Sequence, residues 1–476
     1  MTSETKTIQT QLLVIGGGPG GYAAAFYAAD QGMKVTIVDY AERLGGVCLQ
    51  VGCIPSKALL HAAYLLDETR SAKHLGLDFG DPKVDLASLR NWKDSVVSKL
   101  VGGLHQLAKQ RKVDFVRGRA VFMDSERVTL EESDVEMILF DKAILATGSS
   151  PVIPGPLRIE SPRVMDSTRA LELPEVPRRL LVVGGGYIGL ELATVYAALG
   201  SEVTIVEMTD GLLPGVDRDL VRPVQLRLKK SARAIHLNTK VASLKDTGSE
   251  LLVALEGEAA GEQTFDYALI AVGRRPNSSG LGLENTRVKT DSRGFVIVNS
   301  QRQTDDPRIY AIGDVAGEPM LAHKAHREGK VAVEAILGQP ASYDPAAMPA
   351  VVFTNPEIAW CGLTETQAKA EERNVEIGRF PWGASGRAVT LDRTDGMTKV
   401  IFDPESERVL GVGIVGPGAG ELIAEGVLAI EMGALAHDLA DTIHPHPTLS
   451  ETVMESADVF LGSATDIYRP PKKPVK

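Results

Sequence analysis

Residues 11–21 read QLLVIGGGPGG, an apolar run that passes directly into a cluster of glycines. An alanine-rich stretch of helical character continues to about residue 31, and residues 35–39 (VTIVD) are typical of a buried strand that ends in a carboxylate. The order of strand, glycine turn, helix and strand predicts a βαβ unit of the kind that binds dinucleotides.

Each key residue of this unit has a separate expected task. In a G-x-G-x-x-G turn, Gly16 makes the bend, Gly18 lets the backbone approach a pyrophosphate, and Gly21 lets the helix pack on the strand. Asp39, which ends the second strand, is placed to bond a ribose hydroxyl. Glycine turns also occur for packing reasons alone, but the flanking strand, helix and acid favour a nucleotide.

The same pattern returns in the second part of the chain. An apolar run at 180–183 leads into a second glycine turn, and a helix to about residue 199 precedes the strand 203–207 (VTIVE). The glycines that fill the three positions are Gly184, Gly186 and Gly189. Two such units in one chain indicate two nucleotides bound at once, with electrons moving between them. Glu207 repels a 2'-phosphate and no arginine follows it at 208–210, so NAD is favoured over NADP.

Composition limits the class of protein. A chain of 476 residues is too long for one ordinary core and predicts two to four domains. The net charge of -11 argues against a general nucleic-acid binder and suits docking onto a basic protein partner. The opening MTSETKTIQT has no apolar signal core, and the first apolar run is too short to cross a membrane, so no membrane association is expected. The predicted compartment is the cytoplasm, although a mature organellar protein would look the same. The tail from Arg469 is predicted to be disordered.

Two of the three cysteines lie in residues 45–57, GGVCLQVGCIPSK. A disulfide needs Cα atoms about 4.4–6.8 Å apart, whereas five helical residues rise about 7.5 Å. Gly52 can relax the backbone so that the sulfurs meet, and Pro55 suits the first turn of a helix that starts near Cys53. A helix N-terminus stabilises a thiolate, as a redox sulfur requires. Two buried free thiols, or half of a metal site, are the alternatives, but no second cysteine pair completes four ligands. Cys361, in an apolar run, is expected in the core.

Residues 444–451, HPHPTLSE, precede a helical apolar pattern. Thr448 and Glu451 have the T-x-x-E spacing of a capping box, so Glu451 can be explained as a helix cap and His446 as a loop residue. A redox disulfide offers a second interpretation, because thiol exchange needs a base and an acid, and histidine titrates in the right range.

The CLQVGC box after one glycine fingerprint, with a second fingerprint near residue 184, resembles the pyridine nucleotide-disulfide oxidoreductases. The resemblance runs from Leu12 to about Phe460. It implies an α/β fold of two Rossmann-like dinucleotide-binding domains, for FAD and NAD, plus a C-terminal α+β dimerisation domain. The expected domains are 1–150 (FAD, first segment), 151–272 (NAD), 273–345 (FAD and central, second segment) and 346–476 (dimerisation).

The same resemblance implies roles for single residues. Cys48 and Cys53 form a redox-active disulfide, in which Cys48 is the interchange thiol and Cys53 lies nearer the flavin. His446 is the acid-base group and Glu451 its orienting partner, both contributed across a homodimer interface to the other subunit. Further expected cofactor residues are Lys57, paired with Glu191 near the flavin, Asp314 on the ribityl chain, and Thr147, Gly148 and Gly273 at the crossings between domains.

Some positions depart from the family pattern or lie outside it. Asp39 stands where Glu is usual, and Gln50 where Asn is common. Tyr187, inside the second fingerprint, is expected either to cover the nicotinamide pocket or to be a packed aromatic residue. His444 has no comparable match and is expected to be structural.

Within the family, the sequence is most similar to members that oxidise protein-bound dihydrolipoamide to lipoamide with NAD⁺, docked on the E2 acyltransferase of 2-oxo acid dehydrogenase complexes. Members that reduce glutathione disulfide carry arginines for NADPH and a KK ending to the cysteine box, whereas this chain has Ser56-Lys57 and Glu207. Mercuric reductases have a C-terminal cysteine pair that is absent here. A regulatory protein that binds FAD and senses oxidation is the alternative from another class. No metal site is expected.

Overall fold

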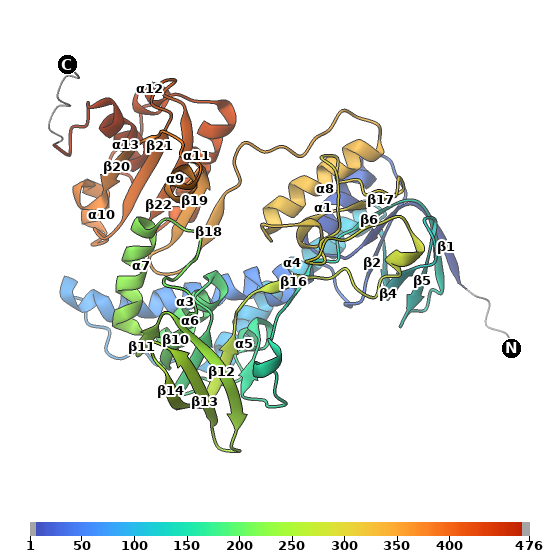
Figure 1. Cartoon of the computed structure of the whole chain (residues 1–476), viewed down its shortest axis with the longest axis horizontal. Coiled ribbons are helices and arrows are strands. Elements are labelled where there is room, and N and C mark those ends of the chain that lie inside the picture. Colours follow the sequence, from blue (N-terminus) through green and yellow to red (C-terminus); the bar gives the residue numbers. More distant parts are fainter. Residues whose placement is uncertain (1–5, 469–476) are drawn as a thin grey trace.

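The computed structural model describes residues 6–468, so the tail from Arg469 lies outside the described residues. Figure 1 shows three parts: a first unit in blue with yellow additions, a second unit in green, and a C-terminal unit in orange and red. Among residues 6–468, none of the helices combines the length and the apolar character needed to span a bilayer. The mixed α/β fold class is as predicted, and the domain boundaries stay predictions.

The first sheet is built around the glycine-flanked strand at the start of the chain. Its order is β3-β2-β1-β6-β5-β4, and β17 pairs with β6. Alternate residues of β1 join different apolar clusters, with Leu13 and Ile15 on one face and Leu12 and Val14 on the other. Because both faces are buried, the strand is continuously apolar. The bounds are β1 Thr7–Ile15, β2 Val35–Asp39, β3 Asp114–Arg117, β4 Arg119–Phe122, β5 Arg127–Glu131, β6 Met137–Leu145 and β17 Ile309–Ala311.

Helices from distant parts of the chain cover this sheet. α1 (Pro19–Asp30) and α8 (Ala322–Ile336) pack against each other. The cysteine segment forms α2 (Gly46–Val51) and the start of α3 (Cys53–Ser71), and α4 (Leu86–Gln110) follows. α3 packs against α6 of the second unit, so the cysteine helix lies between the two units.

The second unit repeats the parallel arrangement, with order β11-β10-β9-β15-β8. An antiparallel sheet of β12, β13 and β14 adjoins it, and β7 pairs with β16 where the chain crosses between units. The bounds are β7 Ser149–Pro151, β8 Val164–Met165, α5 Ser167–Glu172, β9 Arg179–Val183, α6 Tyr187–Leu199, β10 Glu202–Val206, α7 Arg218–Ser231, β11 Ala234–His236, β12 Thr239–Asp246, β13 Leu251–Gly257, β14 Gly261–Phe265, β15 Tyr267–Ile270 and β16 Arg274–Pro276.

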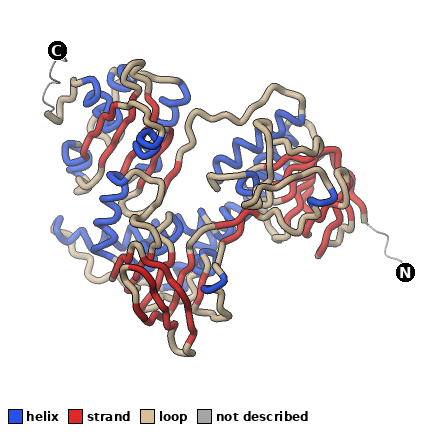
Figure 2. Tube along the Cα trace, viewed as in Figure 1, coloured by secondary structure: helices blue, strands red, loops and turns tan. Residues whose placement is uncertain are grey.

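The C-terminal unit is an antiparallel sheet with helices, as Figure 2 shows, and its order is β18-β19-β22-β21-β20. The bounds are β18 Ala350–Val352, β19 Ile358–Gly362, α9 Glu365–Ala370, β20 Glu376–Pro381, α10 Gly386–Thr390, β21 Met397–Phe402, β22 Val409–Val415, α11 Ala419–Met432, α12 Ala436–Ala440 and α13 Glu451–Leu461. Short 3-10 turns lie at Ala72–Leu75, Gly155–Leu157, Leu283–Asn285, Gly313–Ala316 and Trp382–Ala384. The α+β character predicted for this part is confirmed.

Candidate functional site

The first glycine turn requires glycine at two of its three key positions. Gly16 has φ +112°, and a Cβ there would lie 2.2 Å from the Ala146 carbonyl oxygen. A Cβ on Gly21 would lie 1.8 Å from the carbonyl oxygen of Gly16. Both distances are far below contact, so a larger residue would displace backbone. A Cβ on Gly18 would meet no protein atom closer than 3.9 Å. The open space beside Gly18 suits the close approach of a ligand.

Asp39 is buried at the end of β2 and fixes this turn. Its Oδ2 accepts a hydrogen bond of 2.6 Å from the Gly17 N–H, and its Oδ1 accepts one of 2.9 Å from the Ala41 N–H. Burial raises the pKa of Asp39, while the backbone N–H groups act in the opposite direction. The contact between Asp39 and a ribose stays a prediction.

A cavity of about 880 Å³ opens at this turn. That volume lies within the range of about 300–1,000 Å³ common for small-molecule and cofactor sites. Part of its wall is the start of α1, where free N–H groups and the helix dipole favour a pyrophosphate. These residues therefore fit a dinucleotide. The predicted site residues that line the cavity are Gly16, Gly18, Asp39, Cys48, Cys53, Lys57, Thr147, Gly148, Glu191 and Asp314.

Other predicted residues lie elsewhere. The cavity lining, as far as the described residues define it, does not include Gly21, Gly184, Gly186, Gly189, Glu207, Gly273, His446 or Glu451. Gly21 serves the packing of α1, and Gly273, with φ +135°, lies at the crossing between units. The three key glycines of the second turn and the histidine segment therefore do not line this cavity.

The two cysteines occupy adjoining helices. Cys48 lies in α2, and Cys53 opens α3 as predicted, with Gly52 between the helices. A Cβ on Gly52 would lie 2.8 Å from the Val47 carbonyl oxygen, so the change of direction depends on glycine. Both cysteines are free in this structure, and they lie close enough for each thiol to shift the pKa of the other. The arrangement is that of a dithiol, and the disulfide stays a prediction.

The two thiols differ strongly in acidity. The hydrogen bond from Cys48 lowers the pKa of Cys53 to about 7, against the effect of burial, and the Lys57 ammonium lowers it further. The pKa of Cys48 is raised, first by its hydrogen bond to Cys53 and then by burial. Because the two sites titrate as a pair, the first thiolate forms on Cys53.

Lys57 and Glu191 form the ion pair that the family resemblance implies. The Lys57 Nζ lies 2.8 Å from Glu191 Oε2, and the glutamate side chain is buried. Lys57 comes from α3 and Glu191 from α6, so the pair joins the two units beside the thiols.

Asp314 and Thr147 are held by residues at the crossing between units. Ser149 Oγ donates to Asp314 Oδ2 at 2.5 Å, and Arg274 donates to Ser149 Oγ at 2.7 Å. Thr147 Oγ1 donates to the Asn277 carbonyl oxygen at 2.7 Å. These bonds fix the part of the cavity wall that lies at the crossing between units.

A buried charged group behind Asp314 was not predicted. Glu328 is fully buried, accepts a hydrogen bond of 2.6 Å from the Gly313 N–H, and pairs with Lys324 and Arg302. Lys324 and Glu328 are four residues apart on the buried face of α8. In the sequence, the spacing of Lys324 and Glu328 on an otherwise apolar helix face could have indicated this buried ion pair.

The second glycine turn repeats the first. Gly184 has φ +108°, and a Cβ there would lie 2.4 Å from the Ala271 carbonyl oxygen. A Cβ on Gly189 would lie 2.3 Å from the Gly184 carbonyl oxygen, and one on Gly186 would meet nothing within 4 Å. Tyr187, 41% exposed, lies in the wall of the main cavity. Its role as a cover for the nicotinamide pocket stays a prediction.

Glu207 occupies the same place in the second unit as Asp39 does in the first. Its Oε2 accepts from the Gly185 N–H at 2.7 Å, and its Oε1 accepts from the Thr209 N–H at 2.8 Å. The carboxylate stands where a ribose is expected, and its charge would repel a 2'-phosphate there.

His446 and Glu451 form a pair on the C-terminal unit. The His446 Nδ1 lies 2.8 Å from Glu451 Oε1, and the histidine side chain is 78% exposed. Glu451 Oε2 accepts a hydrogen bond of 2.6 Å from the Thr448 N–H. One oxygen therefore binds the backbone just ahead of α13, and the other orients the imidazole. The predicted capping box is not formed, because the N-cap of α13 is Ser450 and its side chain makes no cap bond. The His444 side chain, by contrast, is only 6% exposed and pairs with Glu425 at 2.7 Å.

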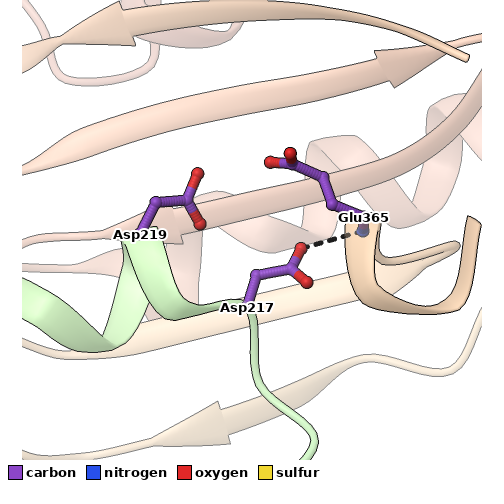
Figure 3. A group of neighbouring side chains, drawn as sticks. All are labelled: Asp217, Asp219 and Glu365. Carbon is purple, nitrogen blue, oxygen red and sulfur yellow. Dashed lines mark hydrogen bonds between the residues drawn. The ribbon is translucent and has the colours of Figure 1, made fainter. Parts of the chain in front are cut away.

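Figure 3 shows three carboxylates, Asp217, Asp219 and Glu365, gathered where the second unit meets the C-terminal sheet. Such a group could suit a cation, but the Lys399 Nζ lies 2.8, 2.7 and 2.6 Å from their oxygens. Burial works to lower the pKa of Lys399, and its hydrogen bonds to these carboxylates outweigh that effect and raise it. The lysine ammonium takes the place of a metal, and the cluster is an internal ion-pair network.

Two family models match the chain. The model described as pyridine nucleotide-disulphide oxidoreductase matches residues 10–329, and the model of that family's dimerisation domain matches residues 348–457. The chain therefore belongs to the pyridine nucleotide-disulphide oxidoreductase family.

Individual proteins similar to this chain indicate which branch of the family it is most similar to. The chain is 47% identical over 466 residues to the dihydrolipoyl dehydrogenase of Vibrio cholerae, covering 97% of this chain and 98% of that protein. It is 46% identical over 466 residues to the dihydrolipoyl dehydrogenase of Bacillus subtilis, covering 97% and 98%. The crystal structure of LpdA from Mycobacterium tuberculosis superposes with a TM-score of 0.87 at 28% identity, covering 94% of this chain and 99% of that one.

Proposed function

We propose that this enzyme is a flavin disulfide oxidoreductase with dihydrolipoyl dehydrogenase activity, which oxidises dihydrolipoamide to lipoamide and reduces NAD⁺ to NADH. The observation that carries the proposal is Cys53 at the start of α3, next to Cys48 and Lys57 in the cavity of the first glycine turn. The names of the full-length relatives support the choice of substrate.

The first unit supplies the residues proposed to hold FAD. These are the glycine turn for the pyrophosphate, Asp39 for the adenosine ribose, Asp314 for the ribityl chain, and Lys57 near the reactive ring. Bound there, FAD would supply a two-electron relay between the dithiol and NAD⁺. The second turn and Glu207 are proposed to bind NAD⁺.

The cysteine pair carries the exchange chemistry. A substrate thiolate attacks Cys48 of the disulfide, the bond between Cys48 and Cys53 breaks, and a mixed disulfide forms. The second substrate thiol then displaces Cys48, which leaves cyclic lipoamide and a dithiol on the enzyme. The low pKa of Cys53 lets it leave as a thiolate. Return of the dithiol to the disulfide releases two electrons and two protons, and NAD⁺ takes up a hydride as one proton is freed.

His446 is proposed to act on the other subunit. It deprotonates the substrate thiol and later returns a proton, while Glu451 orients its Nδ1 so that Nε2 faces the substrate. Support comes from the cavity of the same chain, whose lining contains neither residue. The dimerisation domain supports a homodimer. We further propose docking on an E2 acyltransferase and a cytoplasmic location.

Turnover tests the proposal directly. The holoenzyme is assayed with dihydrolipoamide and NAD⁺, beside glutathione disulfide and NADPH. We expect NADH to form in the first assay and NADPH not to be oxidised in the second, with no reaction in either when Cys48 is replaced by Ser. Activity with glutathione disulfide alone would indicate the sister enzymes, and neither activity would indicate a binding or sensor protein.

The acidity of Cys53 gives a second test. In the reduced holoenzyme of the Cys48→Ala variant, the alkylation rate of Cys53 by iodoacetamide is measured against pH. Loss of the Cys48 thiol, the main cause of the lowered pKa, should move the midpoint up from about 7 toward the ordinary value. In the unmodified reduced enzyme, reactivity should fall as the pH drops below about 7. A midpoint near 9 in the unmodified enzyme would contradict the proposed thiolate.

A further inference from the structure

The Lys57–Glu191 pair has a third partner, Phe353. The Phe353 N–H donates to Glu191 Oε1 at 3.0 Å, while Glu191 Oε2 holds the Lys57 Nζ at 2.8 Å. The same Nζ lies 4.5 Å from the centre of the Phe353 ring. The ammonium therefore contacts a carboxylate and an aromatic face, and Phe353 contributes to both contacts.

Phe353 comes from the C-terminal unit and is firmly placed. It directly follows β18 and packs against the apolar cluster that contains Leu59 of α3 and Leu190 of α6. Two residues later, Asn355 donates to Asp67 of α3 at 2.7 Å. The three units of the chain thus meet at one ion pair beside the reactive thiol.

The charges of this pair act on Cys53 in opposite directions. Lys57 lowers the pKa of Cys53, and Glu191 raises it. The other ionisable groups whose charges couple to Cys53 are Cys48 and the phenols of Tyr22 and Tyr187. Because Coulomb energies inside a protein change steeply with distance, the net effect depends on where the ammonium is held. The ring limits the positions that the flexible lysine side chain can occupy.

We propose that Phe353 is a positioning residue for the proposed redox reaction: its ring holds the Lys57 ammonium where that charge stabilises the Cys53 thiolate. The inference rests on the proposed function in so far as it takes Cys53 to be the working thiolate. It assigns a task in the redox centre to a residue of the C-terminal unit of the same chain, distinct from the contribution of His446 to the partner subunit.

The test uses the reduced holoenzyme in a Cys48→Ser background, where Cys53 is a single accessible thiol and Cys361 is buried. Phe353→Leu removes the ring and keeps the backbone N–H, and Phe353→Tyr keeps the ring. Phe79→Leu, at a side chain 66% exposed, is the matched control. The pH midpoint of iodoacetamide alkylation is measured, together with the pH dependence of the long-wavelength thiolate-to-flavin absorbance.

We expect Phe353→Leu to raise the midpoint by about half a pH unit or more, the size expected when a cation–aromatic contact is lost. Phe353→Tyr and the control should stay at the value of the background. An unchanged or lowered midpoint in Phe353→Leu overturns the inference, as does an equal rise in Phe353→Tyr. Phe353→Met, which retains an apolar side chain without a ring, is measured in parallel in case the Leu variant does not fold.

A double-mutant cycle tests whether Phe353 acts on Cys53 through Lys57. If Phe353 acts through the ammonium, Phe353→Leu adds no further rise when Lys57 is replaced by Met. An equal rise with and without Lys57 overturns the inference. Turnover of dihydrolipoamide by the unmodified enzyme separates the two hypotheses: normal turnover with an unmoved midpoint rejects only the role of Phe353, whereas absent turnover rejects the proposed function.

Discussion

The two glycine turns share the same pattern of backbone hydrogen bonds, which is called the backbone frame below. Gly17 donates its N–H to Asp39 and accepts a hydrogen bond from the Gly45 N–H, and Gly185 donates to Glu207 and accepts from the Leu213 N–H. The sequence spacings are the same in both units. Each turn is therefore fixed through both polar groups of its central glycine, by the acid that ends the next strand and by the loop that follows it.

The units differ in what comes directly after that shared frame. Beyond Gly45 the chain forms α2 with Cys48, close to the nucleotide cavity. Beyond Leu213 it reaches Asp217 and Asp219, which bind Lys399 of the C-terminal sheet. The same frame thus supports redox chemistry in the first unit and attachment between domains in the second.

The largest expected effect tests whether the segment after the second turn serves attachment between domains and the segment after the first turn serves the chemistry. Lys399→Met leaves the buried Asp217 carboxylate without a charged partner, because only uncharged donors remain to it, and should lower the free energy of unfolding by about 3–5 kcal/mol. Compared with the reduced enzyme, Cys48→Ser should leave that free energy within about 0.5 kcal/mol, and it should abolish turnover. Denaturant unfolding measures the free energy of unfolding of each variant, and the dihydrolipoamide assay measures its turnover. A stable Lys399→Met variant with a shifted Cys53 midpoint would show that the second segment also serves the chemistry.

The second largest effect is expected at the first glycine of each turn, where the backbone bends. Gly16→Ala and Gly184→Ala each place a Cβ within 2.4 Å of a carbonyl oxygen at a positive φ, so each should cost about 2–3 kcal/mol of stability. Gly16→Ala should also lose bound flavin, whereas Gly184→Ala should keep it and lose reduction of NAD⁺. Flavin absorbance after gel filtration and thermal unfolding measure these outcomes. Loss of flavin from Gly184→Ala would contradict the assignment of one nucleotide to each turn.

Local signals explain which parts of the molecule could be predicted. The strand-turn-helix units and the start of α3 at Cys53 follow from glycine, proline and apolar patterns within about twenty residues. Phe353 and Lys399 make their contacts across large sequence separations, and no short pattern marks them. For Glu328, the spacing from Lys324 indicates an ion pair but not the buried contact with the Gly313 N–H. For Glu451, one carboxylate oxygen orients the imidazole and the other holds the Thr448 N–H ahead of α13, where the predicted capping box is not formed. A sequence motif identified Glu451 as a candidate, but only the folded chain shows that one carboxylate can make both contacts.

The smallest expected effect on stability concerns the middle glycines of the two turns. Gly18 and Gly186 have φ of -75° and -77°, and a Cβ on either would meet no protein atom closer than 3.9 Å. Alanine should therefore change the free energy of unfolding by less than about 0.5 kcal/mol at both positions. It would still occupy the space that a pyrophosphate needs.

Binding should then separate the two variants. Gly186→Ala should raise the KM for NAD⁺ about tenfold, which corresponds to roughly 1.4 kcal/mol, and Gly18→Ala should weaken retention of flavin without changing that KM at full flavin occupancy. Steady-state kinetics and flavin release on dilution give the two readings. An unchanged KM in Gly186→Ala would mean that NAD⁺ does not approach the second turn through its middle glycine. The shared backbone frame would then reflect common packing and not a common ligand, since the acid and the loop hold the turn without one.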